Sequence, residues 1–283
     1  MTYIEGRNLF RSQLKVFFEI KEIDFYYKMI LKSFFKIEPT SLALEPKTLF
    51  LPAKVKIIKA VLQRLLNEEP LQYILGSTSF RSLELLVTPA VLIPRPETEE
   101  LVEWVLEDYK SINFEHVVID MGTGSGCIAI SLTKEQPFFN VTALDLSSKA
   151  LEIAKSNAIK NKTIVNFLQA DITALSSEIF PVNVIVSNPP YIHPREKKEM
   201  KNNVLNNEPP IALFVPEEDP LLFYRCILEY AQKNLLPDGV IYFEINPYFL
   251  SEMKNLILSI TNYSIEERKD IFGKVRMLRL QSH

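Results

Sequence analysis

Short apolar runs alternate with amphipathic stretches through the second half of the chain. The runs are rich in β-branched residues, as buried strands are, and the stretches between them repeat apolar residues at helical spacing. We expect strands at Val117–Asp120, Val141–Asp145, Ile164–Gln169, Val182–Ser187, Val240–Ile245 and Lys274–Leu280, and helices at Cys127–Lys134 and Ser147–Lys160. Strands that alternate with helices predict an α/β fold with a parallel, doubly wound sheet, whose ligands bind beyond the carboxyl ends of the strands.

Residues 1 to about 75 show a helical pattern instead. After Pro52, which suits the first turn of a helix, apolar residues recur at three- and four-residue spacing. Two earlier helices are expected at Ile4–Phe18 and Glu22–Phe35, both rich in Phe and Tyr. We interpret these aromatic stripes as core packing, with a docking surface for a partner as the alternative.

The pattern between these two regions is extended. It runs from Phe80 to Leu92 and predicts a β-hairpin linker over residues 76–95. Pro96 can then open a helix, because the acidic residues that follow fall in its first turn, where negative charge is favourable.

Composition narrows the classes of protein. The 283 residues include two cysteines and three histidines, too few for a disulfide framework or a metal cluster, so we expect no metal. The chain has no run of eighteen apolar residues and no basic start followed by an apolar core, so we expect a cytoplasmic protein without a membrane span. A formal net charge of −3 gives no support to nucleic acid as the main partner.

A glycine turn follows the first predicted strand directly. It reads Asp120-Met121-Gly122-Thr123-Gly124-Ser125-Gly126-Cys127. A dinucleotide fingerprint, G-x-G-x-x-G, would place its third glycine at position 127, which is occupied by Cys127. The alternating G-x-G-x-G form resembles the first motif of class I methyltransferases, whose loop wraps the amino-acid part of S-adenosylmethionine. Asp145, at the end of the second strand, can accept hydrogen bonds from ribose hydroxyls, and Asp171 can border the adenine; for both, a strand-end cap is the alternative role.

A second motif, Ser187-Asn188-Pro189-Pro190-Tyr191, follows the apolar strand that ends near Val186. Two prolines fix φ and remove two donors, so carbonyl groups remain as acceptors. The Asn188 side-chain oxygen and the Pro189 carbonyl can accept the two N–H groups of a planar amide, and Tyr191 can stack on it. The delocalised lone pair of such a nitrogen makes it a poor nucleophile, and these contacts favour its charged state during methyl transfer.

The chain resembles the HemK/PrmC family of N5-glutamine methyltransferases, which modify peptide chain release factors. Three blocks carry the resemblance: Pro70-Leu71-Gln72-Tyr73-Ile74-Leu75-Gly76, Leu92-Ile93-Pro94-Arg95-Pro96-Glu97-Thr98-Glu99 and Val186-Ser187-Asn188-Pro189-Pro190-Tyr191-Ile192. The middle block is the most specific, since the last also occurs in adenine-N6 methyltransferases. Glu208-Pro209 followed by Ala212-Leu213 matches a further family segment.

The resemblance implies a class I S-adenosylmethionine-dependent methyltransferase fold, Rossmann-like, with a mostly parallel seven-stranded sheet. The implied domains are a helical substrate-docking domain (residues 1–75), the hairpin linker (76–95) and a catalytic domain (96–283). The implied substrate is the glutamine of a release-factor Gly-Gly-Gln loop, the co-product is S-adenosylhomocysteine, and we expect a monomer. The implied cofactor-binding residues are Asp120, Gly122, Thr123, Gly124, Ser125, Gly126, Asp145, Asp171, Ile172 and Asn188. The implied catalytic residues are Asn188, Pro189 and Tyr191, and the implied substrate-binding residues are Asn188, Pro189, Pro190, Tyr191, Arg95 and Thr98.

Three alternatives remain open. The first is an N6-adenine methyltransferase acting on DNA or RNA, with a base flipped into the same loop. The second is a glutamine methyltransferase that modifies a ribosomal protein, and the third is a non-catalytic S-adenosylmethionine-binding module. Two segments depart from the family pattern, namely Glu217-Glu218-Asp219-Pro220 and Asn246-Pro247-Tyr248. Arg95 has an alternative role too, as the partner of a nearby carboxylate.

Overall fold

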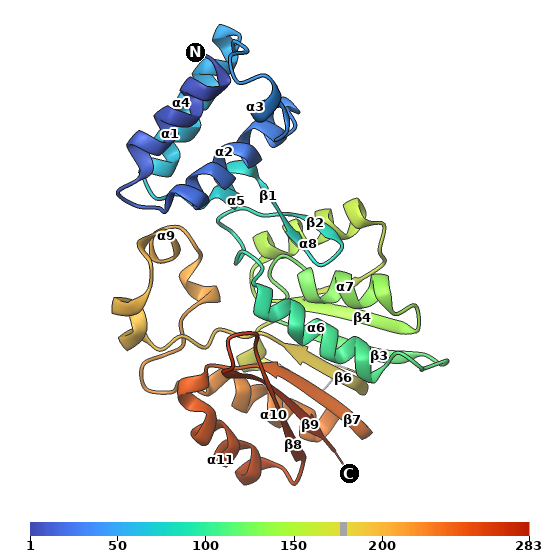
Figure 1. Cartoon of the computed structure of the whole chain (residues 1–283). Helices are drawn as coiled ribbons and strands as arrows, with labels where there is room; N and C mark the ends of the chain where they lie inside the picture. The colour runs from blue at the N-terminus through green and yellow to red at the C-terminus, as the bar shows by residue number, and fades with distance from the viewer. Residues whose placement is uncertain (176–179, 283) are drawn as a thin grey trace. The chain divides into compact units, whose positions relative to one another are not determined.

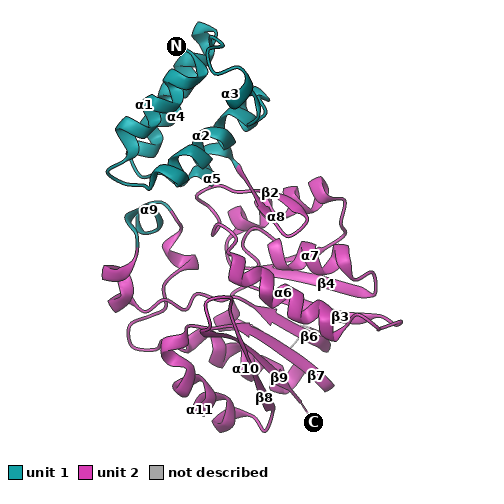
Figure 2. Ribbon diagram, in the orientation of Figure 1, with its two compact units in different colours: residues 1–76, 201–207 teal, residues 77–200, 208–283 magenta. Residues whose placement is uncertain are grey.

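The computed structural model describes residues 1–175 and 180–282, and within them the chain divides into two compact units (Figure 1, Figure 2). The helical unit consists of Met1–Gly76 together with the distant segment Lys201–Asn207. The sheet unit consists of Ser77–Met200 and Glu208–His283. The division expected from the sequence places residues 201–207 in the catalytic domain, whereas in the structure they belong to the first unit.

Amphipathic helices surround a small apolar core in the helical unit. Within the described residues these are α1 (Tyr3–Leu14), α2 (Ile20–Phe35), α3 (Ser41–Leu44), α4 (Pro52–Leu66) and α5 (Leu71–Leu75), whereas the short helix α9 (Asn202–Leu205) has no buried residue. Helix α1 begins at a capping box, in which Thr2 and Glu5 each accept a hydrogen bond from the backbone amide of the other. The rings of Phe10 and Tyr27 pack in this core with centroids 5.0 Å apart. These members of the aromatic stripes are therefore core residues.

Helix α1 is shorter than predicted. The amides of Phe17 and Phe18 both donate to the Leu14 carbonyl, which closes the helix in a turn four residues before its predicted end. The segment that returns from the sheet unit is also tied locally, because Asn207 Nδ2 donates to the Glu68 carbonyl at 3.2 Å.

A seven-stranded sheet lies at the centre of the sheet unit within the described residues, in the order β5-β4-β3-β6-β7-β9-β8. The pairs from β5 to β7 are parallel, and β9 pairs antiparallel with both β7 and β8. The strands are β3 (His116–Met121), β4 (Phe139–Asp145), β5 (Asn166–Gln169), β6 (Val182–Ser187), β7 (Leu235–Glu244), β8 (Ser264–Lys269) and β9 (Val275–Gln281). The mostly parallel, doubly wound sheet is confirmed.

Helices cover both faces of this sheet (Figure 1). One face carries α6 (Pro96–Asp108), α7 (Cys127–Glu135) and α8 (Ser148–Asn161), and the other carries α10 (Leu222–Asn234) and α11 (Leu250–Ile260). Successive strand residues enter different cores, with Val118 in the first and Ile119 in the second. Burial on both sides explains why these strands read as continuous apolar runs. Short 3₁₀ turns lie in the loops after the strands: η1 (Ile172–Ala174), η2 (Pro194–Glu199), η3 (Pro210–Ala212) and η4 (Pro247–Phe249).

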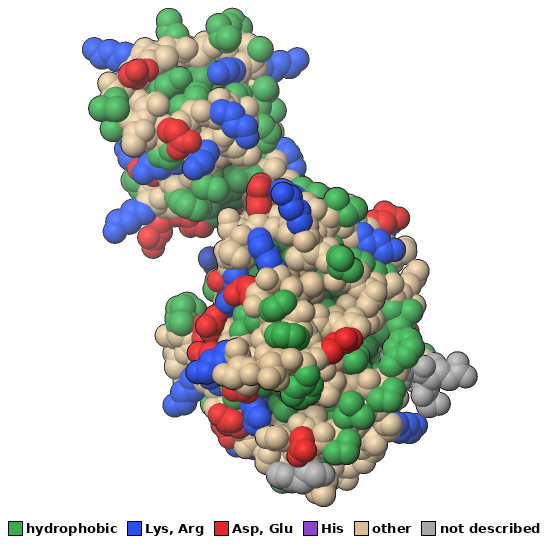
Figure 3. Space-filling model, turned by 90° about the vertical axis from the view of Figure 1, so that its right-hand side faces the viewer, with side chains coloured by type: hydrophobic (Ala, Val, Ile, Leu, Met, Phe, Trp, Pro, Cys, Tyr) green, Lys and Arg blue, Asp and Glu red, His purple; other side chains and the backbone are tan. Residues whose placement is uncertain are grey.

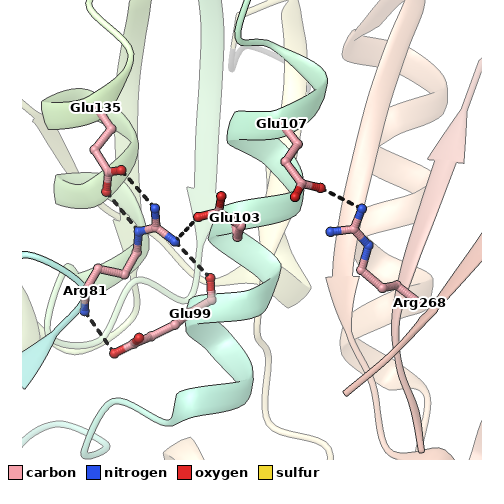
Figure 4. A network of polar contacts seen from close by, with 6 residues as sticks. All are labelled: Arg81, Glu99, Glu103, Glu107, Glu135 and Arg268. Atoms are coloured by element: carbon pink, nitrogen blue, oxygen red, sulfur yellow. Dashed lines mark hydrogen bonds and ion pairs between the residues drawn. The ribbon is translucent and has the colours of Figure 1, made fainter. Parts of the chain in front are cut away.

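An antiparallel hairpin precedes the sheet. Its strands are β1 (Ser77–Phe80) and β2 (Leu83–Leu86). Arg81, at the hairpin turn, donates through its guanidinium to both carboxylate oxygens of Glu135 in α7 and pairs with Glu103 in α6 (Figure 4). The Arg81 amide also donates to the Glu99 carboxylate. The hairpin is thereby pinned to two helices of one sheet face, and it delivers the following loop to that side of the sheet.

The edge of the sheet is where the sequence is least informative. Strand β8 is not predicted, because its sequence, Ser-Ile-Glu-Glu-Arg-Lys, is mostly polar and forms an edge strand without an apolar run. Strand β7 begins at Leu235, whereas the sequence predicts Val240. The Pro237-Asp238-Gly239 triplet inside it resembles a turn, and Asp238 indeed has a left-handed φ of 61°.

Candidate active site

A cavity of about 280 Å³ opens at the carboxyl ends of β3, β4, β5 and β6. The chain runs outward from β3 to β5 and then returns to β6 on the other side of β3, so the cavity lies at a topological switch point of the sheet, where open α/β folds bind ligands. The lining residues are Ala90, Val91, Leu92, Gly122, Gly124, Asp145, Leu146, Ser147, Ala150, Asp171, Ile172, Thr173, Asn188, Pro190, Pro209, Ile211, Ala212 and Phe223.

Two glycines of the turn after β3 face open space. Gly122 and Gly124 have φ of +83° and +54°; a Cβ added at Gly124 would meet nothing within 4 Å, and one at Gly122 would meet only Ile172 Cδ1, at 3.8 Å. Gly126 differs, because its Cβ would lie 2.9 Å from Ile130 Cδ1 and 3.1 Å from Ala154 Cβ. Gly122 and Gly124 therefore let the backbone approach a ligand, whereas Gly126 permits close packing of helices α7 and α8.

Asp120 supports the turn from beneath. Its Oδ2 accepts hydrogen bonds from Thr123 Oγ1 at 2.6 Å and from the Ala129 amide at 3.2 Å. Its Oδ1 is buried and has no partner among the described residues. Complete burial raises the pKa of Asp120 to about 7. Asp120, Thr123, Ser125 and Gly126 are not among the described lining residues of the cavity; they form or support the turn, and their contact with a cofactor stays a prediction.

Two carboxylates that line the cavity stand at strand ends. Asp145 Oδ2 accepts from the Gly124 amide at 2.9 Å and Oδ1 from the Ser147 amide at 2.8 Å, while burial raises the pKa of this carboxyl. Asp171 Oδ1 accepts from the amide of Thr173 at 2.8 Å and caps η1. Asp171 thus fills the cap role that was its alternative and also lines the cavity, next to Ile172.

Asn188 and Pro190 bring the second motif to the same cavity. Asn188 Nδ2 donates to Thr98 Oγ1 at 3.0 Å. Neither Asn188 Oδ1 nor the Pro189 carbonyl accepts a hydrogen bond in the described chain. Asn188 Oδ1 is therefore a free acceptor on a residue that lines the cavity, whereas Pro189 is buried and is not among the lining residues.

Four predicted substrate residues do not line the cavity within the described residues, namely Arg95, Thr98, Pro189 and Tyr191. Arg95 donates instead to the buried carboxylate of Glu208 at 2.7 Å, which is its alternative role. Thr98 and Tyr191 both donate to Glu244, at 2.7 and 2.9 Å respectively. They lie behind Asn188, so any contact of Tyr191 with a substrate remains a prediction.

Glu244 is the main residue that the sequence did not indicate. It ends β7 with 1% of its surface exposed, and burial raises the pKa of its carboxyl. The sequence does contain one signal for it: Glu244 is a charged residue in an apolar strand, and buried carboxylates are rare unless they are paired. Among the described residues, no group of His, Cys, Asp and Glu could hold a metal ion. No described helix has the length and apolar character needed to span a membrane.

Known proteins match the chain in both units. A model of the PrmC N-terminal domain matches residues 9–76, and a model of the methyltransferase small domain matches residues 98–213. The release factor glutamine methyltransferase of Flavobacterium psychrophilum is 41% identical over 276 residues, 97% of each chain. That of Bacteroides thetaiotaomicron is 43% identical over 226 residues, 80% of each chain. The solved structure of the T. thermophilus 16S rRNA N2 G1207 methyltransferase shares the fold, with a TM-score of 0.55 and 16% identity over 73% of this chain and 50% of that one.

Proposed function

The chain belongs to the release factor glutamine methyltransferase family, and we propose that it methylates the side-chain amide nitrogen, N5, of the glutamine in the Gly-Gly-Gln loop of a peptide chain release factor. The methyl donor is S-adenosylmethionine, and the co-product is S-adenosylhomocysteine. The observation that carries the proposal is the free acceptor Asn188 Oδ1, on a residue that lines a cavity bounded by a glycine turn.

The residues around the cavity fit this cofactor. Gly122 and Gly124 leave room for its amino-acid part against their backbone, because no side chain fills that space. The lone pairs of Asp145 that remain after its two backbone hydrogen bonds accept ribose hydroxyls. Ile172 and Asp171 border the adenine. When bound, the cofactor supplies a methyl group on a positively charged sulfur.

The Asn188 segment orients the amide of the substrate. Asn188 Oδ1 and the Pro189 carbonyl would accept hydrogen bonds from its two N–H groups and so fix the orientation of the nitrogen. The same acceptors stabilise the positive charge that develops on this nitrogen during transfer. In-line positioning accounts for most of the acceleration, at best about 7–11 kcal/mol. Tyr191 would shield the amide from water, and one N–H proton would leave the nitrogen after the methyl group is transferred.

We assign docking of the release factor to the helical unit. Figure 3 shows hydrophobic side chains among Lys and Arg on its surface. Val16, Phe17, Ile20 and Phe25, at and after the turn between α1 and α2, are 48–79% exposed. A cluster of exposed apolar side chains is typical of a protein-binding surface.

A single incubation tests the proposed function. The protein is mixed with labelled S-adenosylmethionine, an intact release factor and a DNA duplex, and the labelled residue is mapped by mass spectrometry. We expect the label on the Gly-Gly-Gln glutamine; label on adenine would identify the N6-adenine activity instead. Asn188→Ala should lower turnover by about 10²–10³-fold and leave the affinity for S-adenosylhomocysteine nearly unchanged. Asp145→Ala should lower that affinity, which calorimetry measures.

A further inference from the structure

One buried carboxylate, that of Glu244, is linked to both polar side chains of the Asn-Pro-Pro-Tyr segment, to Tyr191 directly and to Asn188 through Thr98. Glu244 accepts a hydrogen bond from Tyr191 directly, at 2.9 Å, and one from Thr98, at 2.7 Å. Thr98 in turn accepts from Asn188 Nδ2 at 3.0 Å. The end of β7, the first turns of α6 and the loop after β6 therefore share one polar network.

Counting protons sets the direction of each hydrogen bond. When Glu244 is ionised, its carboxylate can only accept hydrogen bonds, so Thr98 and Tyr191 each donate their one hydroxyl hydrogen to it. The Thr98 oxygen then offers only lone pairs to Asn188, and the amide can meet them only with its nitrogen. Oδ1 of Asn188 consequently stays on the other side of the amide, without a partner among the described residues, where Asn188 lines the cavity.

We propose that Glu244 and Thr98 are positioning residues that hold the Asn188 amide in the orientation presenting Oδ1, and not Nδ2, to the methyl acceptor. This inference rests on the proposed function. It makes the site select a nitrogen that carries N–H donors, because a flipped Asn188 would set its own NH₂ against the NH₂ of the substrate.

The surroundings of the network support a role beyond packing. Burying a charged group at the end of an apolar strand costs free energy of folding. Proteins with an apolar residue of similar size in such a place are often at least as stable. Here two hydroxyl groups donate to the carboxylate, those of Thr98 and Tyr191, and Tyr224 Oη separately donates to the backbone carbonyl of Glu244 at 2.8 Å, which fixes the end of the strand. Asn246, which departs from the family pattern, donates to the Tyr191 carbonyl at 3.1 Å and so braces the same segment.

The first test removes the Thr98 hydroxyl. Thr98→Val keeps the shape of the side chain but leaves Asn188 Nδ2 without its acceptor, and Thr98→Ser is the matched control that restores the hydroxyl. With an intact release factor as substrate, we expect T98V to lower kcat by about 10–100-fold, the range for losing a group that orients a functional side chain. T98S should recover most of this loss, and both variants should bind S-adenosylhomocysteine with wild-type affinity in calorimetry.

A second readout does not depend on turnover. In ¹⁵N NMR spectra of the full chain with S-adenosylhomocysteine, the Asn188 side-chain NH₂ signals are assigned by their loss in Asn188→Asp. We expect their protons to exchange slowly with water in the wild type and T98S, and faster in T98V. Glu244→Gln places one acceptor oxygen and one donor NH₂ group opposite the hydroxyls of Thr98 and Tyr191. The two orientations of this glutamine should give two sets of Asn188 signals.

The outcomes separate this inference from the proposed function. Equal exchange in the wild type and T98V, or equal kcat, would overturn the positioning role. Equal impairment of T98V and T98S would also overturn it, by pointing to the Thr98 methyl group and packing. Protected Asn188 signals in a wild-type protein that methylates no release factor would uphold the orientation and count against the proposed function alone.

Discussion

Arg95 donates to Glu208 across 113 positions of sequence, and the Glu208 side chain is only 1% exposed. The other oxygen of Glu208 accepts from the Ile93 amide at 3.3 Å. Pro209 and Ile211, which follow directly, line the cavity. The Ile-Pro-Arg-Pro block therefore anchors the loop that forms one wall of the site. Arg95 affects the site through its ion pair with Glu208.

Arg95→Met should destabilise the sheet unit, because it leaves a buried carboxylate with only one backbone donor. We expect a loss of about 2–3 kcal/mol, below the full range for broken buried pairs since the Arg95 side chain is partly exposed. The sole tryptophan, Trp104, lies in the core of the sheet unit. Its fluorescence during urea unfolding therefore reports on this unit.

The matched control for this prediction is the double variant Arg95→Met/Glu208→Gln. It removes the unpaired charge, so it should recover at least half of the loss. Double and single variants of equal stability would contradict the ion-pair explanation and would favour a packing role for the Arg95 side chain.

Two glycines of the turn after β3 should respond differently to alanine, one mainly in stability and the other mainly in ligand binding. Gly126→Ala adds a Cβ 2.9 Å from Ile130 Cδ1 at a φ of +83°, so we expect about 2–5 kcal/mol of destabilisation. Gly124→Ala meets no atom of the protein, so its cost is the left-handed φ alone, about 1–2 kcal/mol. Its Cβ should instead weaken S-adenosylhomocysteine binding about tenfold or more, close to 1.4 kcal/mol.

Urea unfolding and calorimetry on both variants check this contrast. A Gly124→Ala protein with wild-type cofactor affinity would show that the open space beside Gly124 is not used by the ligand.

Phe17 and Phe25 should contribute to docking of the release factor. They are 48% and 56% exposed, so Phe17→Ser/Phe25→Ser should leave the stability almost unchanged. We expect a rise in KM for the intact factor, with unchanged affinity for S-adenosylhomocysteine. Ile159→Ser, which changes an apolar residue of α8 that is 79% exposed, is the control and should alter neither quantity. Unchanged KM in the double variant would assign these side chains no part in docking.

The elements of the fold could be predicted where each carries its own pattern. Strand β6 was predicted from Val182 to Ser187 without error, because its residues are buried on both faces and read as one apolar run. The edge strand β8 was missed for the opposite reason, since only its pairing with β9 makes it a strand. The return of residues 201–207 to the helical unit depends likewise on contacts between distant segments.

The site could be predicted only to the depth of its motifs. The glycine turn and the Asn188 segment were visible because each motif is continuous in sequence. Glu244 was not, because its hydrogen bond to Thr98 joins residues 146 positions apart. The sequence likewise left the two roles of Arg95 open, because neither Arg95 nor Glu208 alone reveals that they pair.

Asp120 should make the stability of the cofactor-free protein fall as the pH rises. Its pKa is about 7 in the folded state, against an ordinary value of 3.8, because its carboxyl is completely buried. Between these two values the folded state holds a proton that the unfolded state has released, so the stabilisation present below pH 3.8 is lost as the pH approaches 7 and is constant above it. The full effect is on the order of 4 kcal/mol.

Asp120→Asn removes this titration, while its side-chain oxygen can still accept from Thr123 and Ala129. Other carboxyl groups whose pKa is raised, Asp145 and Glu244 among them, also make the unfolding free energy fall with rising pH, and they do so in both proteins. The informative quantity is therefore the difference in unfolding free energy between wild type and D120N, followed by Trp104 fluorescence from pH 4.5 to 8. As the pH rises to about 7, D120N should gain several kcal/mol of stability relative to the wild type. A difference that is flat with pH would mean that Asp120 is already ionised in the folded protein, and that its unpartnered oxygen is solvated or paired in solution.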